Sequence, residues 1–156
     1  MSAFVNKYPR KVFSLQKKPM IVPYLNFGGS TEAAFKHYQS VFGGEFSSLQ
    51  RFSDTPQGAD MPEADRGKIM HISLQVDKDT TIMGSDHLEA MGPLIPGNNF
   101  SLSVHPKSEA EAKRIFDALS AGGQVLMPIE KVFWGAYFGM LTDQFGIKWI
   151  INYQYS

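Results

Sequence analysis

One order of structural signals occurs twice in this chain, and this repeat limits the possible folds more than any other feature. In the first half, an extended apolar run over residues 20–27 is followed by residues 34–42, where apolar side chains recur at helical spacing. Ser30 or Thr31 is suited to cap the start of the predicted helix, and Gly43-Gly44 is suited to end it. The first half therefore predicts a strand, a capped helix and a double glycine.

The second half gives the same order. Apolar residues alternate with serines over residues 100–104, which indicates a strand with two unlike faces. Ser108 and Glu111 form a capping box before the next helical pattern, and Gly122-Gly123 ends that pattern. The two double glycines stand 79 residues apart.

Three further strand-like runs follow each double glycine. They are 45–52, 68–76 and 80–83 in the first half, and 124–132, 136–141 and 148–153 in the second, with a loop over 53–67 and a connector over 88–97. A single βαβββ unit would leave one face of its sheet bare, so two units must pair, face to face or edge to edge, around a shared cavity. We predict an α+β fold in which duplicated βαβββ units form a curved mixed sheet around a cavity. The predicted single domain covers residues 20–156, with repeats over about 20–87 and 98–156.

The charge of the chain is zero overall but unevenly spread. The 15 basic and 15 acidic side chains balance, yet residues 1–19 hold five basic residues and no acid, which leaves the rest of the chain at −5. Nucleic-acid binding draws on Lys and Arg that outnumber the acids, so no nucleic-acid partner is expected. No apolar run is long enough for a membrane partner. Residues 1–19 are predicted to be a basic extension, and Pro9 and Pro19 disfavour the alternative of an organelle transit peptide.

Several chemistries are excluded by motifs that the sequence lacks. There is no cysteine, which removes a disulfide framework, a thiolate metal site and a cysteine nucleophile. No Gly-x-Gly-x-x-Gly follows a strand, and neither a Walker lysine motif nor a Gly-x-Ser-x-Gly elbow occurs. The four histidines are scattered, without metal-ligand spacing. We therefore expect a cytoplasmic protein that is neither nucleotide-dependent nor a serine hydrolase.

Short motifs in a fixed order give the chain a family resemblance. They are Pro23-Tyr24-Leu25-Asn26-Phe27, Tyr38-Gln39-Ser40-Val41-Phe42-Gly43-Gly44, Met70-His71, Met83-Gly84-Ser85-Asp86, Phe133-Trp134-Gly135 and Thr142-Asp143-Gln144-Phe145-Gly146. Together with the duplicated βαβββ order, they resemble the PhnB-like branch of the glyoxalase and bleomycin-resistance superfamily, also called vicinal oxygen chelate proteins. The resemblance implies two units forming a U-shaped sheet around a pocket, and a homodimer.

The resemblance also implies four places where metal-dependent members of the superfamily hold a divalent cation, on the first and last strands of each unit. Strand alternation turns Tyr24 and Asn26 toward the pocket, and the four places then hold Tyr24, Ile82, Asn99 and Ile150. Two aliphatic side chains cannot donate to a divalent cation. We therefore expect no metal and no other cofactor.

The predicted pocket is lined by polar and aromatic side chains. We expect His71 to be the catalytic residue of an active pocket, and the ligand to be bound by Tyr24, Asn26, Ser73, Asp86, Asn99, Ser101, Trp134 and Phe138. Structural alternatives stay open for several of them. Tyr24 and Phe138 suit a core, Asp86 suits a turn, and His71 suits a neutral, hydrogen-bonded core position.

Two classes of function remain open. The first is a protein that binds an unidentified small molecule between aromatic walls without a metal. The second is a lyase or isomerase type of enzyme that uses His71 or a non-standard metal site. A demethylubiquinone methyltransferase, a label that travels with this branch, is disfavoured because no glycine-rich loop follows a strand where a methyl donor could bind.

Overall fold

The computed structural model describes residues 19–156, and the basic extension predicted over residues 1–19 falls almost wholly outside the described residues. The main elements are β1 (Tyr24–Phe27), α1 (Thr31–Phe42), β2 (Glu45–Arg51), β3 (Ile69–Gln75), β4 (Thr81–Asp86), β5 (Leu102–Val104), α3 (Glu109–Ser120), β6 (Gln124–Val132), β7 (Ala136–Thr142) and β8 (Lys148–Gln154). The βαβββ order therefore occurs twice, as predicted. The loop and connector contain short helical turns, which are η1 (Phe52–Asp54), η2 (Pro56–Asp60), α2 (Glu63–Arg66) and η3 (Glu89–Met91).

Each repeat forms its own four-stranded mixed sheet. The strand order is β1-β4-β3-β2 in the first repeat and β5-β8-β7-β6 in the second. Strand β1 runs parallel to β4, and β5 runs parallel to β8, whereas the other pairs are antiparallel. The predicted α+β class is confirmed. The curved sheet differs from the expectation in one respect, because within residues 19–156 it consists of two sheets that do not close into a barrel.

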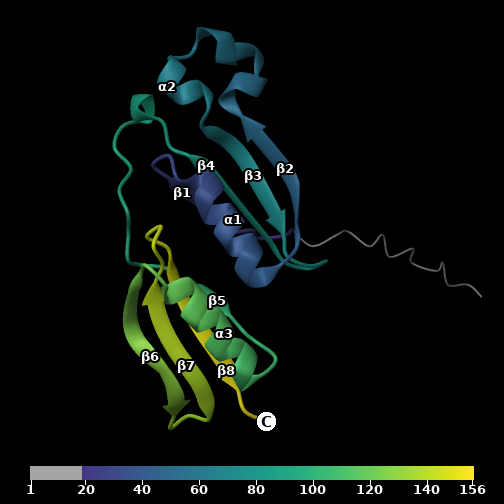
Figure 1. The fold of residues 1–156 in the computed structure, drawn as a ribbon, viewed down its shortest axis with the longest axis vertical. Coiled ribbons are helices and arrows are strands. Elements are labelled where there is room, and N and C mark those ends of the chain that lie inside the picture. The colour runs from purple at the N-terminus through teal and green to yellow at the C-terminus, as the bar shows by residue number, and fades with distance from the viewer. Residues whose placement is uncertain (1–18) are drawn as a thin grey trace, which may run out of the picture.

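One helix covers one face of each sheet, and α1 and α3 lie on the same side of the molecule (Figure 1). Leu25 and Phe27 are buried beneath α1, which leaves Tyr24 and Asn26 on the opposite face of β1 as the alternation predicts. We call the face of each sheet that points away from its helix the open face. No helix within residues 19–156 is both long and apolar enough to span a membrane.

The two helices begin in different ways. Ser108 accepts a 3.1 Å hydrogen bond from the Glu111 N–H at the start of α3, as the capping box predicts. At the start of α1, Ser30 makes no side-chain cap bond. The carboxylate of Asp86 on β4 replaces it, because Asp86 Oδ1 accepts hydrogen bonds from the Thr31 N–H at 3.1 Å and the Thr31 hydroxyl at 2.6 Å.

A buried carboxylate ties the two repeats together. Asp143 follows β7 and is 3% exposed, and its Oδ2 accepts hydrogen bonds from the Tyr38 hydroxyl of α1 at 2.7 Å and from Trp149 Nε1 at 2.8 Å. Its Oδ1 accepts the backbone N–H groups of Phe145 and Ile147 at 2.9 and 3.0 Å. Burial, followed by the charge of Asp143, raises the pKa of Tyr38 far above its usual value. Tyr38 therefore stays a neutral donor to the second repeat.

Candidate functional site

Four predicted site residues meet on the sheet of the first repeat. Tyr24 and Asn26 come from β1, and His71 and Ser73 come from the central part of β3. The Tyr24 hydroxyl lies 3.1 Å from His71 Nδ1, and the two rings stack with centroids 5.7 Å apart and an interplanar angle of 28°. Either group can donate in this contact: the phenol donates to Nδ1 when the neutral ring carries its proton on Nε2, and Nδ1–H donates to the phenol oxygen in the other tautomer. Histidine Nε2 remains available to a ligand, as a donor in the first case and as an acceptor in the second.

The neighbouring side chains support this pair. Met83 pairs in register with both Tyr24 and Ser73, so it lies between them on the sheet. Ser73 is 3% exposed and lies 2.9 Å from the hydroxyl of Ser47. The Ser85 hydroxyl donates to Asn26 Oδ1 at 3.2 Å. Asn26 is thus available at the surface, whereas Ser73 is a buried hydroxyl bonded to Ser47.

The prediction that Ile82 lies on the same face of the sheet as Tyr24 is wrong, because Met83 is the residue that pairs with Tyr24. Ile82 is 6% exposed and belongs to the core, and the residues of β4 that alternate with it, such as Met83 and Ser85, take the open face. Gly84 carries the signal that could have set this register. A Cβ at Gly84 would lie 2.7 Å from the ring of Phe35, so α1 approaches β4 closely on the side that Gly84 and Ile82 share.

The structure places Asp86, which the sequence predicts to bind the ligand, away from the open face. Asp86 is 4% exposed, lies on the helix side of β4, and has both oxygens occupied. In addition to its two bonds with Thr31, it accepts the Gly29 N–H at 3.0 Å and the Ile69 N–H at 2.8 Å. Its alternative interpretation as a structural residue fits these contacts, because it joins the start of α1 to the start of β3.

Trp134 and Phe138 lie on the second repeat. Their ring centroids are 5.4 Å apart, and Phe133 packs edge-on against Trp134 at 4.9 Å. Phe138 on β7 pairs in register with Asn152 on β8. No aromatic contact or hydrogen bond within residues 19–156 joins this cluster to the first repeat's Tyr24 and His71. The single pocket expected from the sequence is therefore divided between two open faces.

Two cavities lie where the repeats meet. The smaller, of about 310 Å³, is lined by Tyr24 and Asn26, with residues 94–97 and 145–148 on its other sides. We call the larger one, of about 780 Å³, the seam cavity. It is lined by residues 20–23, 76–77, 79–82 and 101–107, and by Phe42, Glu111, Arg114, Ile115 and Trp149.

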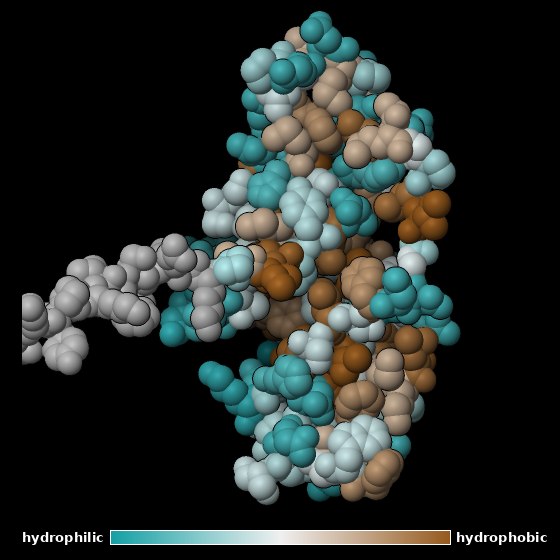
Figure 2. All heavy atoms as spheres, turned by 180° about the vertical axis from the view of Figure 1, so that it is seen from behind, coloured by the Kyte–Doolittle hydropathy of each residue, from teal (hydrophilic) through white to brown (hydrophobic). Residues whose placement is uncertain are grey.

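The predicted site residues Asn99 and Ser101 differ in whether they line one of these cavities. Ser101 lines the seam cavity, whereas Asn99 precedes β5 and lines neither cavity. The surface is hollowed between the two halves of the molecule, at the left in Figure 2. The sequence predicts a shared cavity between the repeats, but of the predicted ligand-binding residues only Ser101 lines the seam cavity. The other lining residues were missed because they come from segments of both repeats, and no local pattern shows which of these segments meet.

The open-face residues of the first and last strands do not fit a divalent metal. Apart from Tyr24, Met83, Lys148 and Ile150, those positions carry amides and hydroxyls, namely Asn26, Thr81, Ser85, Ser103, Asn152 and Gln154. Protein sites for divalent cations rely on carboxylate, imidazole or thiolate ligands. Within residues 19–156, no three His, Cys, Asp or Glu side chains cluster closely enough to hold a metal ion.

Comparison with known proteins decides the family. The family model for 3-demethylubiquinone-9 3-methyltransferase matches residues 19–152. The chain belongs to this family. Protein YjdN of Escherichia coli strain K12, a relative, is 30% identical over 141 residues, which cover 83% of this chain and 92% of YjdN.

Solved structures place this family in the PhnB-like branch. The crystal structure of protein PA1353 from Pseudomonas aeruginosa is 39% identical, with a TM-score of 0.78 over 87% of this chain and 98% of that one. The putative 3-demethylubiquinone-9 3-methyltransferase, PhnB protein, from Bacillus cereus is 26% identical, with a TM-score of 0.70 over 86% and 99% of the two chains. More distant glyoxalase-related and glyoxalase/bleomycin resistance/dioxygenase structures share the fold. The suspected resemblance is confirmed.

The family's name does not describe a site in this chain. A methyl donor or a phosphate group would use free N–H groups at a strand-to-helix turn. In the first repeat that turn runs from Gly28 to Ser30, and the N–H groups of Gly29 and Thr31 are already bonded to Asp86. Nothing in the geometry of residues 19–156 supports a methyltransferase.

Proposed function

We propose that the protein binds a small molecule on the open face of the first repeat. The observation that carries this proposal is the pairing of Tyr24 with His71, two amphipathic rings held together at the sheet surface. Tyr24 is 46% exposed, so a ring face remains available for contact with a flat ligand.

The surroundings suit a ligand with both polar and flat parts. His71 Nε2 offers a donor or an acceptor, according to its tautomer, and the Asn26 amide next to the smaller cavity offers both a donor and an acceptor. A volume of about 310 Å³ lies at the lower end of small-molecule sites. We infer a compact ligand with a hydrogen-bonding group for His71 and a planar group for Tyr24.

A thermal-shift screen of small metabolites tests this proposal. A ligand at 100 times its dissociation constant should add about 2.7 kcal/mol of stability. The variants Tyr24→Ala and His71→Gln should each lose the shift for the same compound, and His105→Gln, on the second repeat, should retain it. If a compound gives the same thermal shift with both first-repeat variants, its binding site lies elsewhere and the proposal is wrong.

A catalytic role for His71 is the second candidate, as a lyase or isomerase type of enzyme. It rests on the same contact, because the Tyr24 hydroxyl holds the His71 ring in place, as a general acid or base requires. Once a turnover is found, His71→Gln should abolish it, and His105→Gln should retain it. Unchanged turnover would remove His71 from the mechanism.

We also propose that the protein is a cytoplasmic homodimer. Apolar residues gather in the middle of the side opposite the helices (Figure 2), and Phe133 is 97% and Phe100 57% exposed. Sedimentation should give twice the chain mass of 17.4 kDa, with Phe133→Ser weakening the association. A single-chain mass at every concentration would rule out the dimer, and cell fractionation tests the location.

A further inference from the structure

The seam cavity is the larger of the two cavities, and the proposed function does not use it. Its volume of about 780 Å³ lies within the roughly 300–1,000 Å³ typical of small-molecule sites. We propose that the seam cavity is a second binding site, which takes an amphipathic monocarboxylate with an apolar body and one charged end. The site shares no lining residue with the Tyr24–His71 pair, so it can exist whether or not that pair binds a ligand.

The inner wall of the seam cavity is apolar. Phe42 from α1, Ile82 from β4, Ile115 from α3 and Trp149 from β8 all line it. Three of these side chains are core residues that expose no more than 6% of their surface, so the wall is held rigidly. The indole N–H of Trp149 is already bonded to Asp143. The carbon surface offered to an apolar ligand body comes from the half-buried lining residues over this core, which are Phe42, Val76, Leu102 and Val104.

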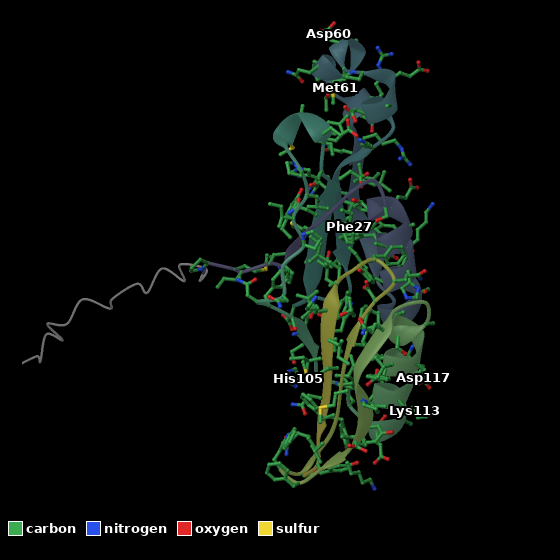
Figure 3. The ribbon with its side chains drawn as sticks, turned by 90° about the vertical axis from the view of Figure 1, so that its left-hand side faces the viewer. Phe27, Asp60, Met61, His105, Lys113 and Asp117 are labelled. Atoms are coloured by element: carbon green, nitrogen blue, oxygen red, sulfur yellow. The ribbon has the colours of Figure 1, made fainter. Side chains whose placement is uncertain are left out.

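A polar edge runs along the second repeat. Ser101, Ser103, His105 and Lys107 are spaced two residues apart, and all four line the cavity. Ser103 Oγ and His105 Nε2 lie 3.1 Å apart. Figure 3 shows His105 on the side of the molecule away from the outer face of α3. Hydroxyl, imidazole and ammonium groups thus gather at one edge of an apolar cavity, as a ligand with one polar end requires.

The acids around the cavity are already engaged. Asp77 Oδ1 accepts two backbone N–H groups of its own turn, each at 2.8 Å. Asp79 Oδ2 lies 3.3 Å from Lys78 Nζ. Glu111 Oε2 accepts the Lys107 N–H at 2.7 Å. These three carboxylates therefore have partners without any ligand.

The cations of the cavity are less engaged. Within residues 19–156, no carboxylate oxygen lies within 4.0 Å of the Lys107 ammonium or the Arg114 guanidinium. Arg114 donates one N–H to the Val41 carbonyl at 3.1 Å, which leaves other donors of its fork free. The pKa of Asp77 is lowered, first by the N–H bond from Asp79 and last by the charge of Lys107. Lys107 lines the cavity without a carboxylate partner within 4.0 Å among residues 19–156, so its ammonium can form a charge-assisted hydrogen bond with a ligand carboxylate.

Isothermal titration of the full chain with decanoate, below its micelle-forming concentration, tests the proposal. Decanoate should bind, and decyltrimethylammonium, which has the same chain and the opposite charge, should bind at least about tenfold more weakly, the effect of 1.4 kcal/mol. Lys107→Gln should weaken decanoate binding by at least about tenfold, because one charge-assisted bond is lost. Thr80→Trp, at the cavity mouth, should abolish binding while the thermal midpoint is kept.

Lys113→Gln is the matched control. Lys113 is an exposed lysine of α3, paired with Asp117 at 2.7 Å, and Figure 3 shows both on the outer face of that helix. The affinity of the Lys113→Gln variant for decanoate should stay within about twofold of that of the parent protein. His71→Gln should also leave decanoate affinity unchanged, which separates this site from the proposed function. Equal binding of the two decyl probes, full affinity in Lys107→Gln or Thr80→Trp, or no binding of decanoate would overturn the proposal.

Discussion

Replacing Asp143 by asparagine keeps the shape of the side chain that joins the two repeats but changes its hydrogen-bonding capacity. In the parent, Oδ1 accepts from Phe145 and Ile147, and Oδ2 accepts from Tyr38 and Trp149. When the amide oxygen keeps the two backbone N–H groups, the new NH₂ group faces two donors. The Tyr38 hydroxyl can turn and accept, but the indole nitrogen of Trp149 can only donate.

The expected cost follows from these contacts. Losing the charge-assisted bond to Trp149 removes about 1.5–3 kcal/mol, and leaving a buried donor without a partner costs about 1–3 kcal/mol. Asp143 is 3% exposed, so water does not supply a replacement partner. The sum is about 2.5–6 kcal/mol, a large share of the roughly 5–15 kcal/mol that stabilises a typical domain. Asp143→Asn should therefore unfold far more easily than the parent.

Urea unfolding followed by circular dichroism measures this cost as a lower midpoint at an unchanged slope. Asp77→Asn is the control, because Asp77 follows β3 as Asp143 follows β7 and accepts turn N–H groups in the same way, but is exposed. The Asp77→Asn variant should lose less than about 1 kcal/mol of its free energy of unfolding. The loss in Tyr38→Phe should lie between those of Asp77→Asn and Asp143→Asn. If Asp143→Asn loses no more stability than Asp77→Asn, the carboxylate does not tie the repeats together and the reasoning is refuted.

Three further predictions concern stability. Gly84→Ala should cost about 1–3 kcal/mol in urea unfolding, since the new Cβ would meet a ring of α1 at 2.7 Å, and a cost near zero would show that α1 can shift. The pKa of Glu32 is lowered by its bond with Lys36 first and Arg51 second, so the stability it contributes is present above pH 4.5 and lost below it. Glu32→Gln should therefore match the parent in acid and be less stable at neutral pH, and an equal gap at both would contradict this. Burial raises the pKa of Tyr38, so stability should fall as the pH rises above 10, and Tyr38→Phe should flatten that fall in thermal-midpoint measurements.

Local patterns in the sequence predict the elements closely, because each pattern reports the faces of one strand or helix. The bounds of β6 match the apolar run over residues 124–132. Strand β1 starts four residues later than the run that predicts it, at Tyr24. Pro23 accepts the Met83 N–H at 3.0 Å, but it has no N–H of its own to continue the ladder. An error in where a strand begins does not change which face of the sheet its side chains take.

The candidate site is predicted less well, because it depends on which face of a strand each residue takes and on contacts between distant segments. A shift of one residue moves a side chain to the other face of a strand, and Ile82 was placed on the wrong face for that reason. Phe138 lies on β7 and Trp134 in the turn before it, so both belong to the second repeat, whereas His71 belongs to the sheet of the first repeat. The periodicity of apolar residues within one repeat gives no information on where the other repeat lies.

Asp77 and Asp143 show why the junction of the repeats escapes sequence reasoning. Both follow the third strand of a repeat, and both accept backbone N–H groups in the turn that leads to the fourth strand. Asp77 remains exposed beside the seam cavity, whereas Asp143 is buried because the Tyr38 hydroxyl of the other repeat reaches it. The same local signal thus gives a solvated turn in one copy and a structural tie in the other. The difference arises only when the repeats pack, so functional differences between the two copies should be sought along that junction.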